Sequence, residues 1–155
     1  MLEAEKVHAR KILESCAGFC NFIYSHPSDY RDKFFHLLTQ YKHVDSLGSH
    51  LPNTDAKPSR DSEDWYGLSI KMKEGYKFSI AMENASCPGY TTEKIISSLQ
   101  AHTVPIYWGT PRVSDYINPA AFINCNDFGT MEEVAERVRE IDSDNDKWID
   151  MVTQP

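Results

Sequence analysis

The stretch from Tyr76 to Gly109 constrains the fold more than any other part of this 155-residue sequence. Residues 76–84 alternate outward polar and inward apolar side chains, which is typical of a β-strand. A turn containing Pro and Gly follows at residues 85–89, and an amphipathic helical pattern then leads into a second strand at residues 104–108. The order strand, turn, helix, strand predicts a right-handed crossover between two parallel strands.

Polar side chains gather at one end of this predicted unit. The N-terminus of the crossover helix lies above the carboxyl end of the sheet, where backbone N–H groups and the helix dipole favour anionic ligands. Asn84, Tyr90, Glu93 and Lys94 all fall at that end. We therefore expect a ligand site at this edge of the sheet.

Strands and helices alternate along the rest of the chain. The residue patterns predict strands at 18–25, 43–46 and 121–124, helices at 3–15, 29–41, 65–74 and 131–141, and a last helical turn at 148–151. Ser28 is expected to cap the helix that begins at Asp29. The segment from Leu47 to Asp64 is rich in turn-forming residues and is expected to form a long surface loop, either a flap or an insertion. The alternation predicts an α/β fold with a Rossmann-like, mostly parallel sheet flanked by helices.

The composition disfavours several classes of protein. Hydrophobic residues make up 41% of the chain, which is close to the average of globular domains. No apolar run approaches the roughly 20 residues that span a bilayer, and the N-terminus lacks the apolar region of a secretory signal. The net charge of −7 argues against a nucleic-acid partner, because phosphates favour a basic face. A few local cations still suffice to hold a small anion.

The thiols and the acidic motifs are expected to be structural. The cysteines are Cys16, Cys20, Cys87 and Cys125. Their spacing favours reduced and mostly buried thiols, with a bridge between the first two or the last two as the alternative. The segment Asp142–Asp146 contains two Asp-x-Asp patterns, but it lies between two predicted helices, where Asp and Asn serve as caps. The six histidines show no metal-ligand spacing, so we expect no metal site.

Five ordered sequence blocks between Gly18 and Met151 form a recognisable set. They are Cys20–Ser25 (CNFIYS), Tyr76–Asn84 (YKFSIAMEN), Gly89–Ile96 (GYTTEKII), Val104–Gly109 (VPIYWG), and Asn118-Pro119 with Phe122–Asn124 (FIN). In this order and with this spacing, the chain resembles the α1,3/α1,4-fucosyltransferases, glycosyltransferase family 10, which move fucose from GDP-fucose to sugar acceptors. The Tyr-Thr-Thr-Glu-Lys and Pro-Ile-Tyr-Trp-Gly pieces are the most specific parts of the match.

The resemblance implies that residues 18–155 form the GDP-fucose-binding half of a GT-B glycosyltransferase, preceded by a helix or linker at residues 1–17. In this family the acceptor-side half comes first and carries the proposed general base. We therefore expect that half to be absent here and expect no catalytic residue in this chain. The implied enzyme is inverting, requires no cofactor or metal, and transfers fucose to a sugar hydroxyl of a glycan.

The resemblance also assigns residues to the donor. A leaving GDP gains negative charge, so a site without a metal needs fixed cations. Arg31 and Lys94 match the family's cations on the pyrophosphate, and Arg31 is otherwise misplaced in the first turn of a helix. Glu93 matches an acceptor for sugar hydroxyls, whereas Asn84 and Tyr90 match positions that contact the nucleotide sugar.

Four of these five assignments have a structural alternative. From spacing alone, Lys94 is more typical of a solvated helix lysine and Arg31 of a surface ion pair with Asp29 or Asp32, and the motif match reverses that preference. Glu93 reads as a carboxylate that stabilises the helix dipole. Tyr90 reads as a half-buried packing aromatic.

Two departures from the family pattern bear on the expected flap. Leu47-Gly48 stands where family members often have two glycines, and a lengthened loop follows. Cys87-Pro88 precedes Tyr90 where the family has small residues. We expect both changes to alter closure of the flap over the donor.

Two rival functions and the compartment stay open. One rival is a nucleotide-sugar-binding module that does not catalyse or acts only with a partner chain. The other is a different nucleotide-binding α/β domain such as an oxidoreductase, which the missing Gly-x-Gly-x-x-Gly pattern disfavours. The resemblance implies a cytoplasmic or membrane-peripheral location for a bacterial enzyme and the Golgi lumen for a eukaryotic one.

Overall fold

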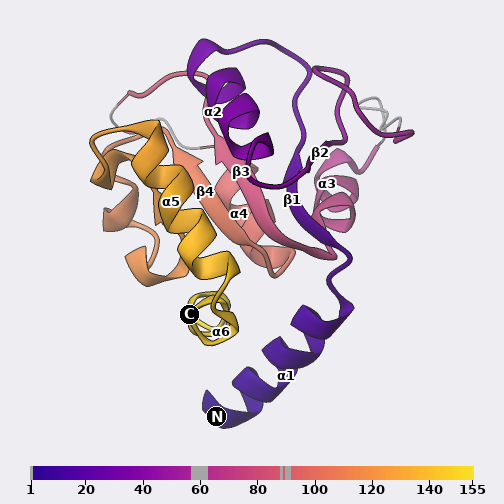
Figure 1. Ribbon diagram of the computed structural model, residues 1–155, viewed down its shortest axis with the longest axis vertical. Helices are drawn as coiled ribbons and strands as arrows, with labels where there is room; N and C mark the ends of the chain where they lie inside the picture. The colour runs from indigo at the N-terminus through magenta and orange to yellow at the C-terminus, as the bar shows by residue number, and fades with distance from the viewer. Residues whose placement is uncertain (1, 57–62, 88, 90–91) are drawn as a thin grey trace.

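A computed structural model describes residues 2–56, 63–87, 89 and 92–155 (Figure 1). Within them, five parallel strands form one sheet in the order β2-β1-β3-β4-β5. The strands are β1 (Gly18–Phe22), β2 (Val44–Ser46), β3 (Tyr76–Met82), β4 (Val104–Trp108) and β5 (Ile123–Asn124). The helices are α1 (Leu2–Ser15), α2 (Asp29–Thr39), α3 (Trp65–Lys73), α4 (Glu93–Gln100), α5 (Met131–Asp142) and α6 (Asn145–Val152). The predicted α/β class and the crossover β3-α4-β4 are confirmed.

The helices cover both faces of the sheet. Figure 1 shows α2 and α5 in front of the strands and α4 behind them, while α1 extends below the sheet beside α6. Lys6 on α1 pairs with Asp150 on α6 at 2.6 Å. The chain moves outward from β1 to β2 in one direction and from β3 to β4 in the other. The boundary between β1 and β3 is therefore the topological switch point, where ligands of doubly wound sheets bind.

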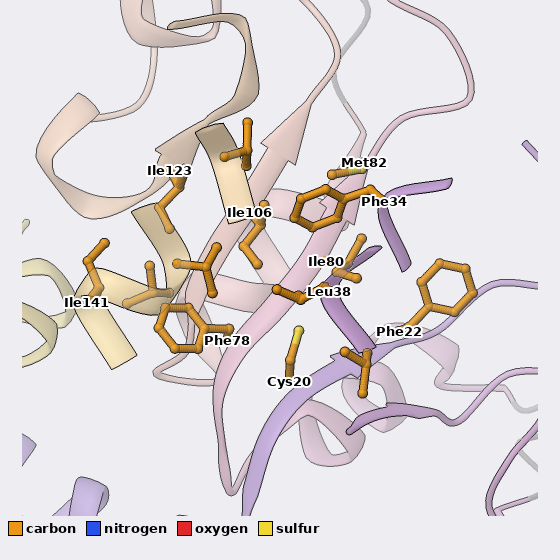
Figure 2. Close-up of a cluster of buried hydrophobic side chains, with 14 of the residues drawn as sticks. Cys20, Phe22, Phe34, Leu38, Phe78, Ile80, Met82, Ile106, Ile123 and Ile141 are labelled. Atoms are coloured by element: carbon orange, nitrogen blue, oxygen red, sulfur yellow. The ribbon is translucent and has the colours of Figure 1, made fainter. Parts of the chain in front are cut away.

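The main core lies between the sheet and the helices α2 and α5. Figure 2 shows apolar side chains from these elements meeting in one cluster. Phe22, Phe34, Leu38, Phe78 and Ile141 have no exposed surface. Burying each such side chain contributes about 1.5–3 kcal/mol, so this face fixes the positions of β1, β3 and α2.

The first strand ends earlier than the sequence pattern predicts. β1 stops at Phe22 because its partner strand β2 ends at Ser46. The chain after β2 still hydrogen-bonds to the end of β1, since the Leu47 amide donates to the Phe22 carbonyl at 2.9 Å. A Cβ at Gly48 would lie 2.3 Å from the Tyr24 carbonyl oxygen, so only glycine allows this approach. The departure at Leu47-Gly48 thus keeps the one glycine that the contact requires.

Smaller differences concern element ends. The predicted strand at 121–124 is reduced to Ile123–Asn124, because Asn118 caps a 3-10 turn at Pro119–Ala121. Ser28 occupies the N-cap position of α2, but its side chain makes no capping hydrogen bond. The last helical turn or two, expected around Trp148 to Met151, is helix α6. Within the described residues, no helix is both long enough and apolar enough to cross a membrane.

A cluster of charged groups lies at the amino end of the sheet. The Asp142 carboxylate accepts hydrogen bonds from Tyr41 at 2.6 Å, Lys42 at 2.7 Å and Lys77 at 2.7 Å. Burial alone would raise the pKa of Asp142, but these three hydrogen bonds outweigh it and lower the pKa. Of the predicted acidic caps, Asp144 caps α6 by accepting from the Lys147 amide, whereas Asp142 is the buried centre of this ion cluster.

All four cysteines are free thiols, as the preferred interpretation predicts. Cys20 and Cys125 are buried, Cys16 is half-buried and Cys87 is exposed. Burial raises the pKa of the Cys125 thiol to about 12.

Candidate functional site

Two consecutive residues at the carboxyl end of β3 organise the candidate site. Glu83 continues the strand by one step, since its amide donates to the Trp108 carbonyl of β4 at 2.7 Å. Successive side chains of a strand point to opposite faces. Accordingly, Glu83 contacts the start of α4 and Asn84 contacts the start of α2.

Asn84 holds Arg31. The Arg31 Nη1 donates to the Asn84 Oδ1 at 2.8 Å, and Nη2 donates to the His26 carbonyl at 2.8 Å. The guanidinium also lies over the Tyr24 ring, 3.7 Å from its centroid. Arg31 is only 1% exposed, so it is a buried cation of the switch point and not a surface side chain. The sequence prediction brought Arg31 and Asn84 to the same site, and the structure places them in contact.

Glu83 holds Lys94. The Glu83 carboxylate has no exposed surface, and its Oε2 lies 3.3 Å from the Lys94 Nζ. Thr92, the N-cap of α4, donates its amide to Glu83 Oε1 at 2.8 Å and places its hydroxyl within 2.9 Å of both carboxylate oxygens. Lys94 is 23% exposed in its side chain, so it is not a freely solvated lysine.

The remaining predicted residues differ in how far the structure describes them. Glu93 lies exposed in the first turn of α4, beside Lys94. Tyr90 lies outside the described residues, as do Pro88 and Thr91 of the adjoining motif.

The turn after Asn84 is tied to the loop after β4. Ser86 donates its hydroxyl to the Gly109 carbonyl at 2.7 Å, and the Gly89 amide donates to the Thr110 hydroxyl at 3.1 Å. A Cβ at Gly109 would lie 2.6 Å from the Glu83 Cγ, so this glycine lets the loop close on the buried glutamate.

Helix α4 is anchored by buried polar contacts that sequence reasoning missed. Ser98 donates to the Lys94 carbonyl at 2.8 Å and contacts the Ser79 hydroxyl at 3.1 Å. From α3, Lys73 donates to Ser97 at 2.5 Å and is 7% exposed. Burial lowers the pKa of Lys73 to about 8, with nearby Glu93 raising it and Lys94 lowering it.

Neither Glu83 nor Lys73 carries a sequence signal of its own. Glu83 falls inside a strand pattern, and Lys73 reads as one more lysine on a charged helix. The available signal for Glu83 was its place: a carboxylate at the end of a predicted strand, ahead of a helix whose second residue is Lys94. Among the described residues, no group of three or more His, Cys, Asp or Glu is arranged to hold a metal ion.

These features define a class of protein. A doubly wound parallel sheet carries two held cations, Arg31 and Lys94, and the N-terminus of α4 at its switch point. Such an arrangement suits a negatively charged ligand such as a nucleotide phosphate. Residues 15–152 match the family model for the C-terminal part of glycosyltransferase family 10, the fucosyltransferases, and the chain belongs to this family.

Similar proteins and a similar solved structure agree with this family assignment. The chain is 33% identical over 140 residues to an α-(1,3)-fucosyltransferase of Helicobacter pylori, covering 87% of this chain and 27% of that protein. It is 35% identical over 127 residues to GDP-fucose protein O-fucosyltransferase 3 of Homo sapiens, covering 77% of this chain and 25% of that protein. A crystal structure of an α1,3-fucosyltransferase with GDP-fucose superposes with a TM-score of 0.80 at 30% identity, covering 88% of this chain and 38% of that one. The chain thus spans about a quarter of the length of these curated relatives.

Proposed function

We propose that this chain binds GDP-fucose as the donor half of an inverting, α1,3-fucosyltransferase-like enzyme. The observation that carries the proposal is the Glu83-Asn84 pair. Its two side chains hold Lys94 and Arg31 at the switch point, on the two sides of one strand end. Membership of the fucosyltransferase family and the likeness to a structure with GDP-fucose support the choice of ligand.

In this proposal each cation has a chemical task. GDP leaves as the bond to fucose breaks, and its diphosphate gains charge. Lys94 offers a compact ammonium to the diphosphate, and Arg31, whose guanidinium donates to Asn84 and the His26 carbonyl, supplies a fixed positive charge at the switch point. Because both are held before the donor arrives, they stabilise the leaving group without reorganisation.

The neighbouring polar residues would orient the sugar and ribose. Glu93 is exposed beside Lys94 and is suited to accept hydrogen bonds from hydroxyl groups. The Asn84 side-chain oxygen accepts from Arg31, and its NH2 group, which has no hydrogen-bond acceptor among the described residues, is assigned to the ligand. Tyr90 is assigned to the same ligand on the family motif alone.

The acceptor and the chemistry at the sugar belong to the rest of such an enzyme. We place the general base, the glycan acceptor site and the inversion at the anomeric carbon in an acceptor-side domain. We assign residues 18–155 to the donor domain and residues 1–17, which include helix α1, to a helix or linker that precedes it. No metal or cofactor is assigned to the donor site.

Calorimetric titration of the chain with GDP and GDP-fucose tests the proposal. Lys94→Ala is expected to weaken GDP binding at least tenfold, as is Arg31→Lys, which keeps a charge but loses the two-pronged geometry. Lys33→Ala, on the exposed side of α2, is the matched control and should bind like wild type. Unchanged affinity in both site variants would remove the diphosphate assignment.

A second candidate is a binding module that acts only with a partner chain or does not catalyse. It is favoured by the residues assigned to the site, because Arg31, Asn84 and Lys94 are all assigned to donor binding and none of them to bond formation at the sugar. Assays of GDP-fucose hydrolysis and fucose transfer by the isolated chain separate the two. Turnover by the chain alone would exclude the module.

A further inference from the structure

We infer that Glu83 is a positioning residue that aims the Lys94 ammonium at the donor's diphosphate. This inference rests on the proposed function. It assigns a specific role to a buried carboxylate that would not itself touch the ligand.

The surroundings of Glu83 leave it little freedom. Its side chain has no exposed surface, and the backbone at Gly109 packs closely against its Cγ. Its carboxylate accepts from the amide and hydroxyl of Thr92 and from Lys94. One carboxylate therefore fixes both Thr92, the N-cap of α4, and the position of the Lys94 ammonium.

The hydrogen bonds of Lys94 indicate where the ammonium points. An ammonium has three N–H donors. The structure gives two of them acceptors on the inner side, Glu83 at 3.3 Å and the Thr92 hydroxyl at 3.2 Å. No further acceptor for Lys94 lies among the described residues, and its side chain is partly exposed. The third N–H is thus left for a ligand at the carboxyl edge of the sheet.

The two roles open to Glu83 predict opposite changes in GDP affinity when its charge is removed. A carboxylate that merely lowers the local positive charge would repel a diphosphate, so removing its charge would strengthen GDP binding. A carboxylate that orders Lys94 spares the ligand the cost of immobilising a long, flexible side chain. Loss of that ordering would weaken GDP binding.

The test is calorimetric titration of the full chain with GDP in four variants. Glu83→Gln keeps the shape of the side chain and an acceptor for the Thr92 amide, but it loses the charge that holds Lys94. We expect about tenfold weaker GDP binding in Glu83→Gln. We also expect that adding it to Lys94→Ala has no further effect, because Glu83 acts through Lys94. Glu136→Gln, an exposed glutamate on α5, is the charge-matched control.

Each outcome decides the matter. A structural role alone would weaken GDP binding equally with and without Lys94, and tighter or unchanged binding in Glu83→Gln would contradict positioning.

Circular dichroism checks that the variant folds. If it does not, Thr92→Val removes only the hydroxyl shared by Glu83 and Lys94, and it should weaken GDP binding a few-fold through Lys94 or else the inference fails. Wild-type chain that does not bind GDP overturns the proposed function together with this inference, whereas binding that needs Lys94 but not Glu83 overturns the inference alone.

Discussion

The two ends of the sheet each hold a buried carboxylate with lysine partners, and they differ in what the lysines have left to offer. At the amino end, Asp142 collects Lys42, Lys77 and Tyr41, and Lys77 also donates to the Asp142 carbonyl. At the carboxyl end, Glu83 holds one lysine, Lys94. In the Asp142 cluster the charged groups face one another. In the Glu83 pair, one N–H donor of the Lys94 ammonium is left for a ligand at the carboxyl edge of the sheet.

A buried lysine–carboxylate pair therefore does not by itself mark a binding site. The Asp142 cluster joins the end of α5 to the end of α2 and the start of β3, which is a structural task. The Glu83 pair lies at the switch point, next to exposed polar residues and a loop. Location at the carboxyl edge and unused donor capacity are the features that separate function from packing.

The largest effect is expected at the amino end. Asp142→Asn leaves the 14%-exposed Lys77 without its charged partner, and we expect it to lower the free energy of unfolding by about 3 kcal/mol. Urea unfolding measures this, with the exposed Asp146→Asn as the control. GDP affinity should stay unchanged in the folded Asp142→Asn protein. A loss of GDP binding there would break the comparison.

The Asp142 carboxylate also makes the free energy of unfolding depend on pH in the acid range. The folded-state pKa of Asp142 is lowered from its ordinary 3.8, so its stabilising effect is present above that pH and is lost as the pH falls below it. Unfolding of wild type and Asp142→Asn measured from pH 6 to pH 3 should therefore converge toward low pH. A constant difference would mean that the hydrogen bonds do not favour the ionised form.

A second lysine sharpens the contrast near the site. Lys73 has its pKa lowered from 10.5 to about 8, so between these values the unfolded chain binds more protons than the folded one. Wild-type stability should therefore rise relative to Lys73→Met as the pH goes from 8 to 10.5, by on the order of 2–3 kcal/mol. Parallel curves of unfolding free energy against pH for the two proteins would show that Lys73 keeps an ordinary pKa.

A smaller effect separates two helix caps. Thr92 caps α4 by accepting from the Lys94 amide, and Thr130 caps α5 by accepting from the Glu133 amide. Replacing either by Ala should cost about 1 kcal/mol of stability. Only Thr92→Ala should also weaken GDP binding, because only Thr92 touches Lys94 and Glu83. Equal GDP affinity in the two variants would argue that the α4 start is a cap and nothing more.

The sequence predicts the layout better than it predicts the contacts. Hydrophobic periodicity locates β3, α4 and β4, and the motif match brings Arg31, Asn84 and Lys94 to one edge, because these depend on local pattern and chain order. It misses Asp142 as an ion centre, since Lys42 lies 100 residues away in the chain. It misses Glu83 because the burial of that side chain and its contact with Lys94 depend on how Gly109 and the start of α4 pack against it. The early end of β1 likewise depends on Gly48 meeting Tyr24, a contact that no local pattern shows.

The most direct measurement exchanges the two ends: GDP affinity and unfolding free energy are both measured for Lys94→Ala and for Lys77→Ala. Lys94→Ala should lose at least tenfold in GDP affinity, and it should also lose stability because it leaves the buried Glu83 carboxylate without its cation. Lys77→Ala should lose stability and keep its affinity for GDP. If Lys77→Ala weakens GDP binding as much as Lys94→Ala does, the carboxyl edge of β3 is not the donor site.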